Sequence, residues 1–194
     1  MMGTTHRTGS IALACGVVAL CPKDQISLIP AATFVVASAI GGLFPDADTP
    51  YSTYGRRFMI ILWPFYLIRK AISMLGCLIK PLKNVGKALG HRGLFHSPLL
   101  WTVIFGLIFA IFKFFGVNDA IAYSILFGGY TGIISHVLLD YISGGVPLLA
   151  PVKMKRYTPP IKFKTGGIFE VLFNVAFIGI SVLCVLYALP KIGL

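Results

Sequence analysis

Five long apolar runs constrain the fold of this chain more than any other feature. Hydrophobic residues make up 57% of the sequence, charged residues make up 12%, and the mean hydropathy is +0.86. A soluble core of 194 residues cannot bury that much apolar surface. We therefore predict an all-α, polytopic membrane helix bundle that forms a single integral membrane domain over residues 1–194. The candidate spans are residues 9–20, 26–44, 98–117, 120–142 and 168–189.

The first of these runs is short for a transmembrane helix. It crosses a bilayer only if its helix starts near Thr4 or Thr5 and continues to Cys21. A cleaved signal peptide is the alternative, because Arg7 precedes the apolar stretch. Cleavage would discard His6, which belongs with the other metal-binding residue types, so we favour a retained first helix.

Residues 51–90 differ in character from the apolar runs. Two apolar segments, 58–68 and 71–79, are each too short to span, and Arg69 and Lys70 separate them. Burying these cations at mid-membrane would cost about 2.5–3.5 kcal/mol each. We predict amphipathic helices at the membrane surface that contact anionic lipid head groups, or alternatively a simple membrane-surface lid. Residues 143–167 are predicted to form a second basic segment, a loop on the cytoplasmic side.

The basic residues predict which side of the membrane these segments face. If the first two runs cross and residues 51–90 do not, the N-terminus, residues 45–97, the end of run 120–142 and the start of run 168–189 share one side. That side carries fourteen of the seventeen Lys and Arg residues, so the positive-inside rule makes it cytoplasmic. The net charge of +11 then reflects topology, and we predict membrane lipids and no nucleic acid as partners.

A glycine-flanked turn with two histidines precedes the third run. His91 and His96 lie five residues apart in it, and Ser97 and Pro98 follow. Ser97 is a good helix N-cap and Pro98 suits the first helical position, which predicts His96 at the mouth of a membrane helix. Five residues along a regular helix leave two side chains about 140° apart, so the turn must fold back for both rings to reach one point.

Two pairs of potential ligands lie near the ends of other runs. Asp46 and Asp48 form a D-x-D motif between prolines, which predicts an extended turn with carboxylates converging on a cation; an ordinary turn is the alternative. His136 and Asp140 are four residues apart, about 40° apart on one helix face. This pair suits a bidentate metal platform or, alternatively, a hydrogen bond in which His136 donates to Asp140.

Together with His6, these residues predict a site for one or two divalent metal ions. One tetrahedral zinc needs about four ligands, so seven residues suit two metals, or one metal with supporting residues around its ligands. Mixed imidazole and carboxylate donors suit zinc, manganese or iron better than calcium, and we favour zinc or manganese. The predicted ligands are His6, Asp46, Asp48, His91, His96, His136 and Asp140.

Two further residues are predicted to serve catalysis. Arg92 lies between two predicted ligands and suits a phosphate clamp or the stabilisation of developing negative charge. A plain cytoplasmic-side cation is the alternative for Arg92. Glu170, at the start of the last run, is a candidate general base or a group that holds a ligating histidine.

These motifs resemble those of a known family. The resemblance rests on His6 and on residues 45–50 (PDADTP), 90–97 (GHRGLFHS) and 135–140 (SHVLLD); it continues through residues 145–151 to Glu170 and leaves out the interfacial region. The family consists of small bacterial inner-membrane proteins described as predicted membrane-bound metal-dependent hydrolases, one of them controlled by the SOS repressor LexA. Thr49 and Phe95 stand where the family often has His and Thr, and neither is a predicted ligand.

The residues and the resemblance predict a metal-dependent hydrolase at the cytoplasmic face of the bacterial inner membrane. A metal-activated water would attack a phosphoester or related bond, and the membrane-surface position favours a lipid or lipid-linked substrate. A metal-ion transporter or channel is one alternative, although transporters usually place ionisable groups near mid-membrane. A non-catalytic membrane partner with a structural metal is the other.

Overall fold

The computed structural model of the chain describes residues 2–25, 27–57, 59–75, 85, 88–90, 93–160, 163 and 165–192. Helices dominate these residues, and the only β-pairing described is an isolated bridge between Val146 and Tyr157, so the all-α prediction is confirmed. The α-helices are α1 (Gly3–Leu20), α2 (Leu28–Gly41), α3 (Thr53–Arg57), α4 (Met59–Leu75), α6 (Pro98–Phe114), α7 (Ala120–Gly144) and α8 (Ile168–Ile192). The 3-10 helices are η1 (Lys23–Gln25), η2 (Pro45–Asp48) and η3 (Leu94–His96).

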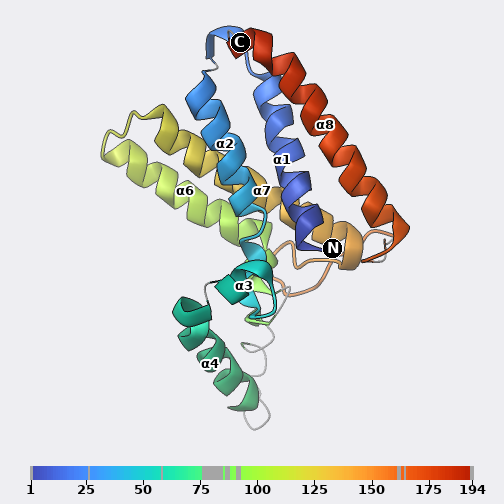
Figure 1. Cartoon of the computed structure of the whole chain (residues 1–194). Helices are drawn as coiled ribbons and strands as arrows, with labels where there is room; N and C mark the ends of the chain where they lie inside the picture. The colour runs from blue at the N-terminus through green and yellow to red at the C-terminus, as the bar shows by residue number, and fades with distance from the viewer. Residues whose placement is uncertain are drawn as a thin grey trace.

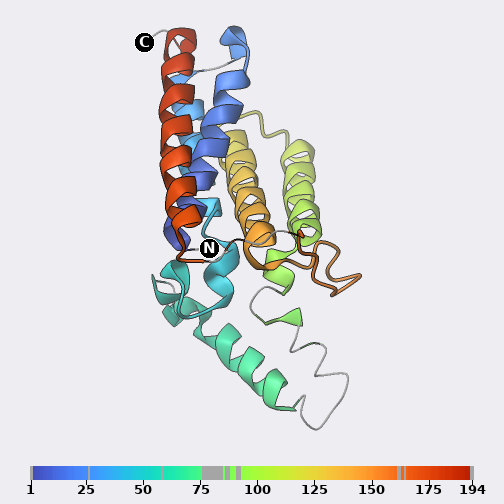
Figure 2. The ribbon, with the colours of Figure 1, turned by 90° about the vertical axis from the view of Figure 1, so that its right-hand side faces the viewer.

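The bundle consists of α1, α2, α6, α7 and α8 (Figures 1 and 2). α1 packs against α2, α7 and α8, while α7 also packs against α2 and α6. The starts of α1, α6 and α8 and the ends of α2 and α7 lie at one end, which we call the η2 end because η2 joins it (Figures 1 and 2). The end of α8 lies at the opposite end, beside the connection from α1 to α2 (Figure 1). The helices therefore alternate in direction, as the parity argument requires.

Three helical stretches are long and apolar enough to cross a membrane: Leu28–Ala47, Ala120–Gly144 and Ile168–Ile192. They confirm the predicted runs 26–44, 120–142 and 168–189. The first stretch includes a turn and part of η2, since the α-helical hydrogen bonding of α2 already ends at Gly41. α6 is apolar but has only 17 residues. α1 has 18 residues, which corresponds to about 27 Å of helix. The crossing of the membrane by α1 and α6 stays a prediction.

Glycines let α2 and α7 pack backbone against backbone. A Cβ atom at Gly41 would lie 2.2 Å from the carbonyl oxygen of Gly129, and a Cβ atom at Gly132 would lie 2.0 Å from that of Ser38. Both distances are far below van der Waals contact, so a side chain at either position would force the helices apart. Small residues commonly allow such close approach between membrane helices. The contact holds Gly42, the C-cap of α2, beside α7.

Polar contacts join α1 to α8 at both ends. Asn174 donates to the Thr5 hydroxyl at 2.8 Å, close to the start of both helices. At the opposite end, Lys191 donates to the carbonyl oxygen of Ala19 at 2.6 Å, and its ammonium lies 4.3 Å from the ring centroid of Tyr187. Lys191 thereby satisfies a carbonyl that the last turn of α1 leaves without a helical partner.

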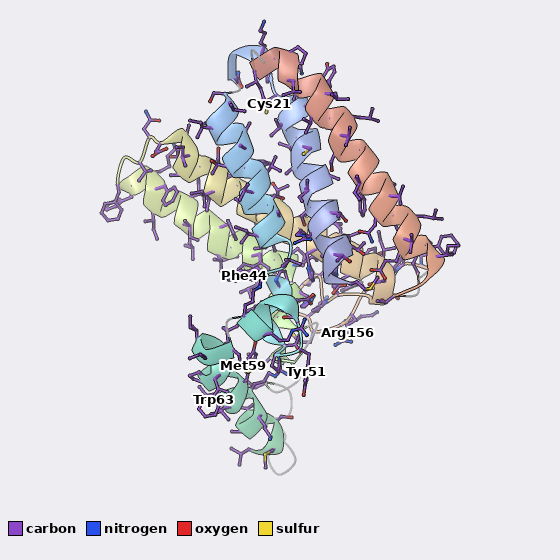
Figure 3. The ribbon with its side chains drawn as sticks, in the orientation of Figure 1. Cys21, Phe44, Tyr51, Met59, Trp63 and Arg156 are labelled. Atoms are coloured by element: carbon purple, nitrogen blue, oxygen red, sulfur yellow. The ribbon has the colours of Figure 1, made fainter. Side chains whose placement is uncertain are left out.

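The region after η2 forms two helices, α3 and α4, and α4 projects away from the bundle beyond the η2 end (Figures 1 and 2). The sequence predicted two short segments separated by Arg69 and Lys70, but α4 continues through both cations. Both are good helix formers, and neither Gly nor Pro interrupts the chain there. Met59 and Trp63 lie on this helix, outside the bundle (Figure 3). Its placement at the membrane surface stays a prediction.

Candidate metal centre

α7 supplies the first two side chains of the site. His136 and Asp140 are four residues apart on this helix, and both are buried. Nδ1 of His136 lies 2.7 Å from the carbonyl oxygen of Gly42. A carbonyl oxygen can only accept, so Nδ1 carries the proton and Nε2 presents a lone pair in the neutral ring. Nε2 of His136 lies 3.7 Å from Oδ2 of Asp140, longer than a usual hydrogen bond, so this distance favours the metal platform over the alternative of a hydrogen bond from His136 to Asp140.

His96 reaches the same place from the start of α6. It ends η3, and its side chain is fully buried. The predicted N-cap is confirmed: the Ser97 hydroxyl accepts from the backbone N–H of Leu100 and donates to the carbonyl oxygen of Ala150 at 2.6 Å. Trp101 adds a hydrogen bond from its indole N–H to the carbonyl oxygen of Phe95 at 2.7 Å. The backbone on both sides of His96 is thus tied down.

Asp46 arrives from the end of α2. The sequence predicted an extended turn for the D-x-D motif, whereas residues 45–48 form the 3-10 helix η2. Pro45 explains the difference, because its fixed φ angle suits the first position of a helical turn. The Asp46 side chain keeps 19% of its surface exposed. The side chain of Asp48, also in η2, lies outside what the structure describes.

Four donor atoms converge with the spacing of a metal site. Nε2 of His96 lies 3.2 Å from Oδ2 of Asp140, 3.5 Å from Oδ1 of Asp46 and 3.4 Å from Nε2 of His136. Nε2 of His136 lies 3.6 Å from Oδ1 of Asp46. In a tetrahedral zinc site with bonds of about 2.0–2.2 Å, neighbouring donors lie about 3.3–3.6 Å apart. These four residues, which we call the metal group, could hold a metal ion.

The contact between the two imidazoles supports this interpretation. Nδ1 of His136 donates to Gly42, so its Nε2 lone pair points at Nε2 of His96, 3.4 Å away. A proton on Nε2 of His96 would make this contact a hydrogen bond, and a cation bound by both nitrogens would suit the same spacing. Carboxylate oxygens of Asp46 and Asp140 complete the surroundings, and together with imidazole nitrogens they form a donor set suited to zinc or manganese.

His6 adjoins the metal group from α1. Its Nε2 atom lies 3.3 Å from Oδ1 of Asp140, the oxygen that does not face His96. Its ring stacks on that of His136, with centroids 3.7 Å apart and planes inclined by 16°. His6 is buried, and within the described part of the chain its Nδ1 atom has no hydrogen-bond partner. The expected link between the N-terminus and the α7 pair is therefore present.

Glu170 is buried at the start of α8 and is not part of the metal group. It contacts Thr5, which directly precedes His6 in the sequence. Its Oε1 atom accepts from the Thr5 hydroxyl at 2.7 Å and from the backbone N–H of Met2, and its Oε2 atom accepts from Gly166 N–H at 2.6 Å. These bonds hold the first turn of α1. These three contacts are to Met2, Thr5 and Gly166, so both roles predicted for Glu170, general base and support of a ligating histidine, stay predictions.

Of the seven predicted ligands, the structure brings five together, four in the metal group and His6 beside it. His91 and Arg92 lie outside the described residues. Sequence reasoning missed the carbonyl oxygen of Gly42, which orients His136, and the Thr5 and Asn174 side chains near Glu170. A backbone acceptor leaves no trace in residue type. Thr5 and Asn174 can be seen in the sequence as polar residues in or near apolar runs, but nothing in their spacing indicates that α1 and α8 bring them together.

One comparison with known proteins gives a match. The family described as YdjM inner membrane protein matches residues 1–192 of the chain. No curated protein and no solved structure matches it.

Proposed function

We propose that the chain, which belongs to the YdjM inner membrane protein family, is a metal-dependent hydrolase that cleaves a phosphoester of a lipid or lipid-linked substrate at the membrane surface. Family membership confirms the inner-membrane part of the resemblance seen in the sequence. Hydrolysis is our proposal, and it rests on one observation. Two imidazole and two carboxylate donors from η2, η3 and α7 lie within 4.8 Å of one another and could share one ion.

The choice of donors supports catalysis over a structural role. Structural zinc sites are usually rich in cysteine and closed on all sides. The metal group has no sulfur ligand, and Asp46 keeps part of its side chain exposed while the other three residues are buried. A substrate and a water molecule would approach from the Asp46 side. A divalent ion held here would lower the pKa of a bound water toward neutrality and polarise a phosphoryl oxygen.

The residues around the metal group would orient its ligands. Gly42 fixes the tautomer of His136, and His6 contacts the second oxygen of Asp140. Such outer contacts set ligand orientation, and their loss commonly costs about 10–100-fold in metal affinity. The reaction would form a bond from the water oxygen to phosphorus and break the bond from phosphorus to the lipid oxygen, which leaves as an alcohol after taking up a proton. Binding of the phosphate by Arg92 stays a prediction.

Location of the metal group at helix ends favours hydrolysis over ion transport. Asp46 and His96 belong to η2 and η3, and His136 and Asp140 belong to the last nine residues of α7, which ends at the η2 end, whereas transporters usually bind ions near mid-membrane between broken helices. The η2 end is also the side that carries fourteen of the seventeen Lys and Arg residues in the topology derived from sequence. By the positive-inside rule we place it in the cytoplasm. Its cations would attract anionic lipids to the site.

Metal analysis and a substrate screen test the proposal. The purified protein is expected to contain zinc or manganese and to release phosphate or a phosphorylated head group from at least one member of a panel of phospholipids and lipid phosphates. His96→Ala should lose both metal and activity. Asp46→Asn keeps the shape of the side chain but removes a charged ligand, and it should lose activity with a large drop in metal affinity.

Asp119→Asn is the matched control for Asp46→Asn. Asp119 is an exposed carboxylate that caps α7 at the far end from the metal group, and asparagine caps helices equally well. This variant should retain full metal content and turnover. Stoichiometric metal without hydrolysis of any substrate in the panel would contradict the proposed reaction and favour a structural metal. Full metal content in His96→Ala would contradict the site itself.

A further inference from the structure

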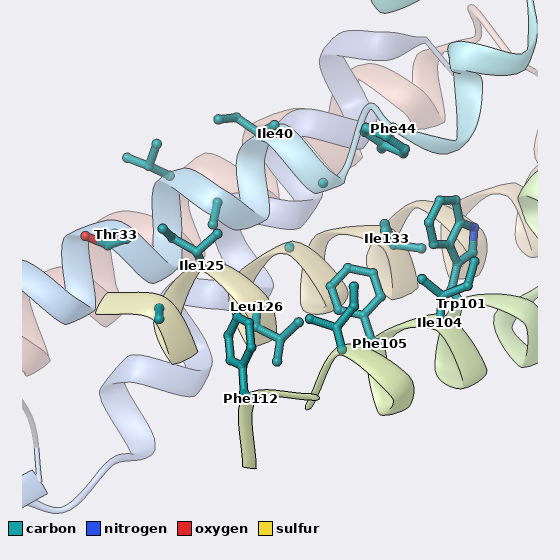
Figure 4. A pocket seen from close by; sticks show the side chains of 16 residues that line it. Thr33, Ile40, Phe44, Trp101, Ile104, Phe105, Phe112, Ile125, Leu126 and Ile133 are labelled. Atoms are coloured by element: carbon teal, nitrogen blue, oxygen red, sulfur yellow. The ribbon is translucent and has the colours of Figure 1, made fainter. Parts of the chain in front are cut away.

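An apolar groove runs between α2 and α6, with α7 as its floor (Figure 4). Its volume is about 690 Å³, within the range of about 300–1,000 Å³ that small-molecule sites occupy. Thr33 carries the only hydroxyl among its lining side chains, and the indole N–H of Trp101 already donates to the carbonyl oxygen of Phe95. The groove therefore offers a ligand apolar contact and almost no hydrogen bonding.

One end of this groove adjoins the metal group. Phe44 precedes Asp46 by two residues, and Ile133 precedes His136 by three, less than one helical turn. The rings of Phe44 and Trp101 meet edge to face, with centroids 5.6 Å apart. In Figure 4, Phe44, Trp101 and Ile133 lie at one end of the groove and Thr33 lies at the other. A long ligand in the groove would thus point one terminus at the metal group.

The side of the groove is open along the bundle. Val36, Ile40 and Ile125 line it and are 58%, 51% and 55% exposed. The first two belong to the membrane-spanning candidate Leu28–Ala47 and the third to Ala120–Gly144. Their exposed surfaces would therefore face the hydrocarbon of the bilayer. An apolar chain could enter sideways without crossing water.

We propose that this groove binds one hydrocarbon chain of the lipid whose phosphate reaches the metal group. The inference rests on the proposed function and narrows its substrate to a lipid phosphate with an extended chain. Moving a chain from the bilayer into the groove exchanges one apolar contact for another, so the groove contributes position more than affinity. A chain held along α7 would fix the distance of the phosphate from the metal group, which is how contacts remote from a reacting atom assist catalysis.

Photo-crosslinking of a lipid chain tests the inference directly. The protein is placed in nanodiscs with a trace of phosphatidic acid that carries a diazirine on one acyl chain, and adducts are located by peptide mass spectrometry after illumination. We expect adducts on the groove residues of α2, α6 and α7 in clear excess over those on α8, whose outer face is also exposed. Adducts spread evenly over α8 and the groove would overturn the proposal.

Two variants fill the groove, one from its floor on α7 and one from its wall on α2. A Cβ atom at Gly129 meets only the Phe105 ring, at 3.7 Å, so the rest of a leucine side chain would occupy the groove. Gly129→Leu should lower groove labelling about tenfold, as expected for an overpacking cost at the lower end of the usual range. Ala37→Leu fills the groove from α2 and replaces Gly129→Leu if that variant does not fold.

Gly106→Leu is the matched control. Gly106 lies on α6, and no atom lies within 4 Å of a Cβ atom built there. This variant receives the same side chain outside the groove and should be labelled like the unmodified protein. Unchanged labelling in both groove-filling variants would overturn the proposal. Loss of a dimer in those variants, with labelling unchanged, would show instead that the groove is an interface between two copies of the chain.

The same experiment separates this inference from the proposed function, because labelling needs no turnover. Groove labelling in a protein that hydrolyses no lipid phosphate would contradict the reaction and leave the chain site standing. Hydrolysis of a lipid phosphate without groove labelling would contradict the chain site and leave the proposed reaction standing. A diacylglycerol with the same photoreactive chain tests the link to the metal group. Because it has no phosphate, it should label the groove of the metal-loaded protein more weakly than phosphatidic acid does. Equal labelling by the two lipids would overturn that link.

Discussion

The two sides of α7 that face α2 and α6 are packed in opposite ways. Toward α2 the backbones touch, and no side chain fits at Gly41 or Gly132. Toward α6 aromatic rings hold the helices apart, with Phe105 and Tyr130 at a centroid distance of 5.4 Å. The groove lies on this second side. One helix thus has a strict contact on one face and a loose contact on the other.

The strict contact lies where the metal group needs fixed geometry. His136 is oriented by the carbonyl oxygen of Gly42, which α2 holds beside Gly132. A shift of an ångström between the helices would break this hydrogen bond and turn the ring. The loose contact tolerates such a shift, because the side chains there adapt to a neighbour. The difference indicates that α2 and α7 form the frame of the site and that α6 forms its adaptable wall.

Gly132→Ala is expected to have the largest effect, because it attacks the strict contact. The new Cβ atom would lie 2.0 Å from the carbonyl oxygen of Ser38 and 2.6 Å from the backbone nitrogen of Gly42. Backbone atoms cannot rotate away, so α2 must move. We expect the free energy of unfolding to fall by about 1–3 kcal/mol. Thermal unfolding in detergent measures this loss, and metal titration should show weaker binding because Gly42 moves away from His136.

Gly129→Ala is the control for this prediction. It makes the same change one turn earlier on α7, but its Cβ atom meets only the Phe105 ring, at 3.7 Å. We expect the unfolding temperature and the metal affinity to stay close to those of the unmodified protein. If Gly129→Ala proved as damaging as Gly132→Ala, the two sides of α7 would not differ in the way that we infer.

Trp101→Phe is expected to have an intermediate effect on the loose side. The variant keeps an aromatic ring but loses the indole hydrogen bond to the carbonyl oxygen of Phe95. Loss of one such bond costs about 0.5–1.5 kcal/mol. Phe95 directly precedes His96, so metal affinity should fall as well, though less than in Gly132→Ala. Metal titration of the two variants side by side decides the order, and a larger loss in Trp101→Phe would place the frame of the site in α6.

Much of this framework is visible in the sequence, but only as separate parts. The apolar runs predict α2, α7 and α8, and the spacing of four between His136 and Asp140 predicts their shared helix face. Residue type alone marks Asp46 and His96 as potential ligands. Parity of the crossings then predicts that all of them meet at one end of the bundle. These steps need only helix geometry and membrane thickness.

The remaining details depend on contacts between segments far apart in the chain. Stacking of His6 on His136 and the hydrogen bond to Gly42 depend on how closely α1 and α2 approach α7. Glycine-rich sequence permits close packing but does not say which partner or which turn is involved. The groove is harder still to predict, because it is defined by where α6 fails to pack closely. No residue pattern marks an absence of contact.

Tyr130→Phe is expected to have the smallest effect and probes the one polar contact described between the middle of α7 and α6. The hydroxyls of Tyr130 and Thr102 lie 2.8 Å apart, and Thr102 already donates to the carbonyl oxygen of Pro98, so Tyr130 is the donor. Hydrogen bonds between membrane helices contribute about 0.6 kcal/mol on average. We expect a loss of this size in unfolding free energy and no change in metal content. A double-mutant cycle with Thr102→Val isolates the pair, and a coupling well above 1 kcal/mol would mean that α6 is held to α7 more strictly than the groove between α2 and α6 suggests.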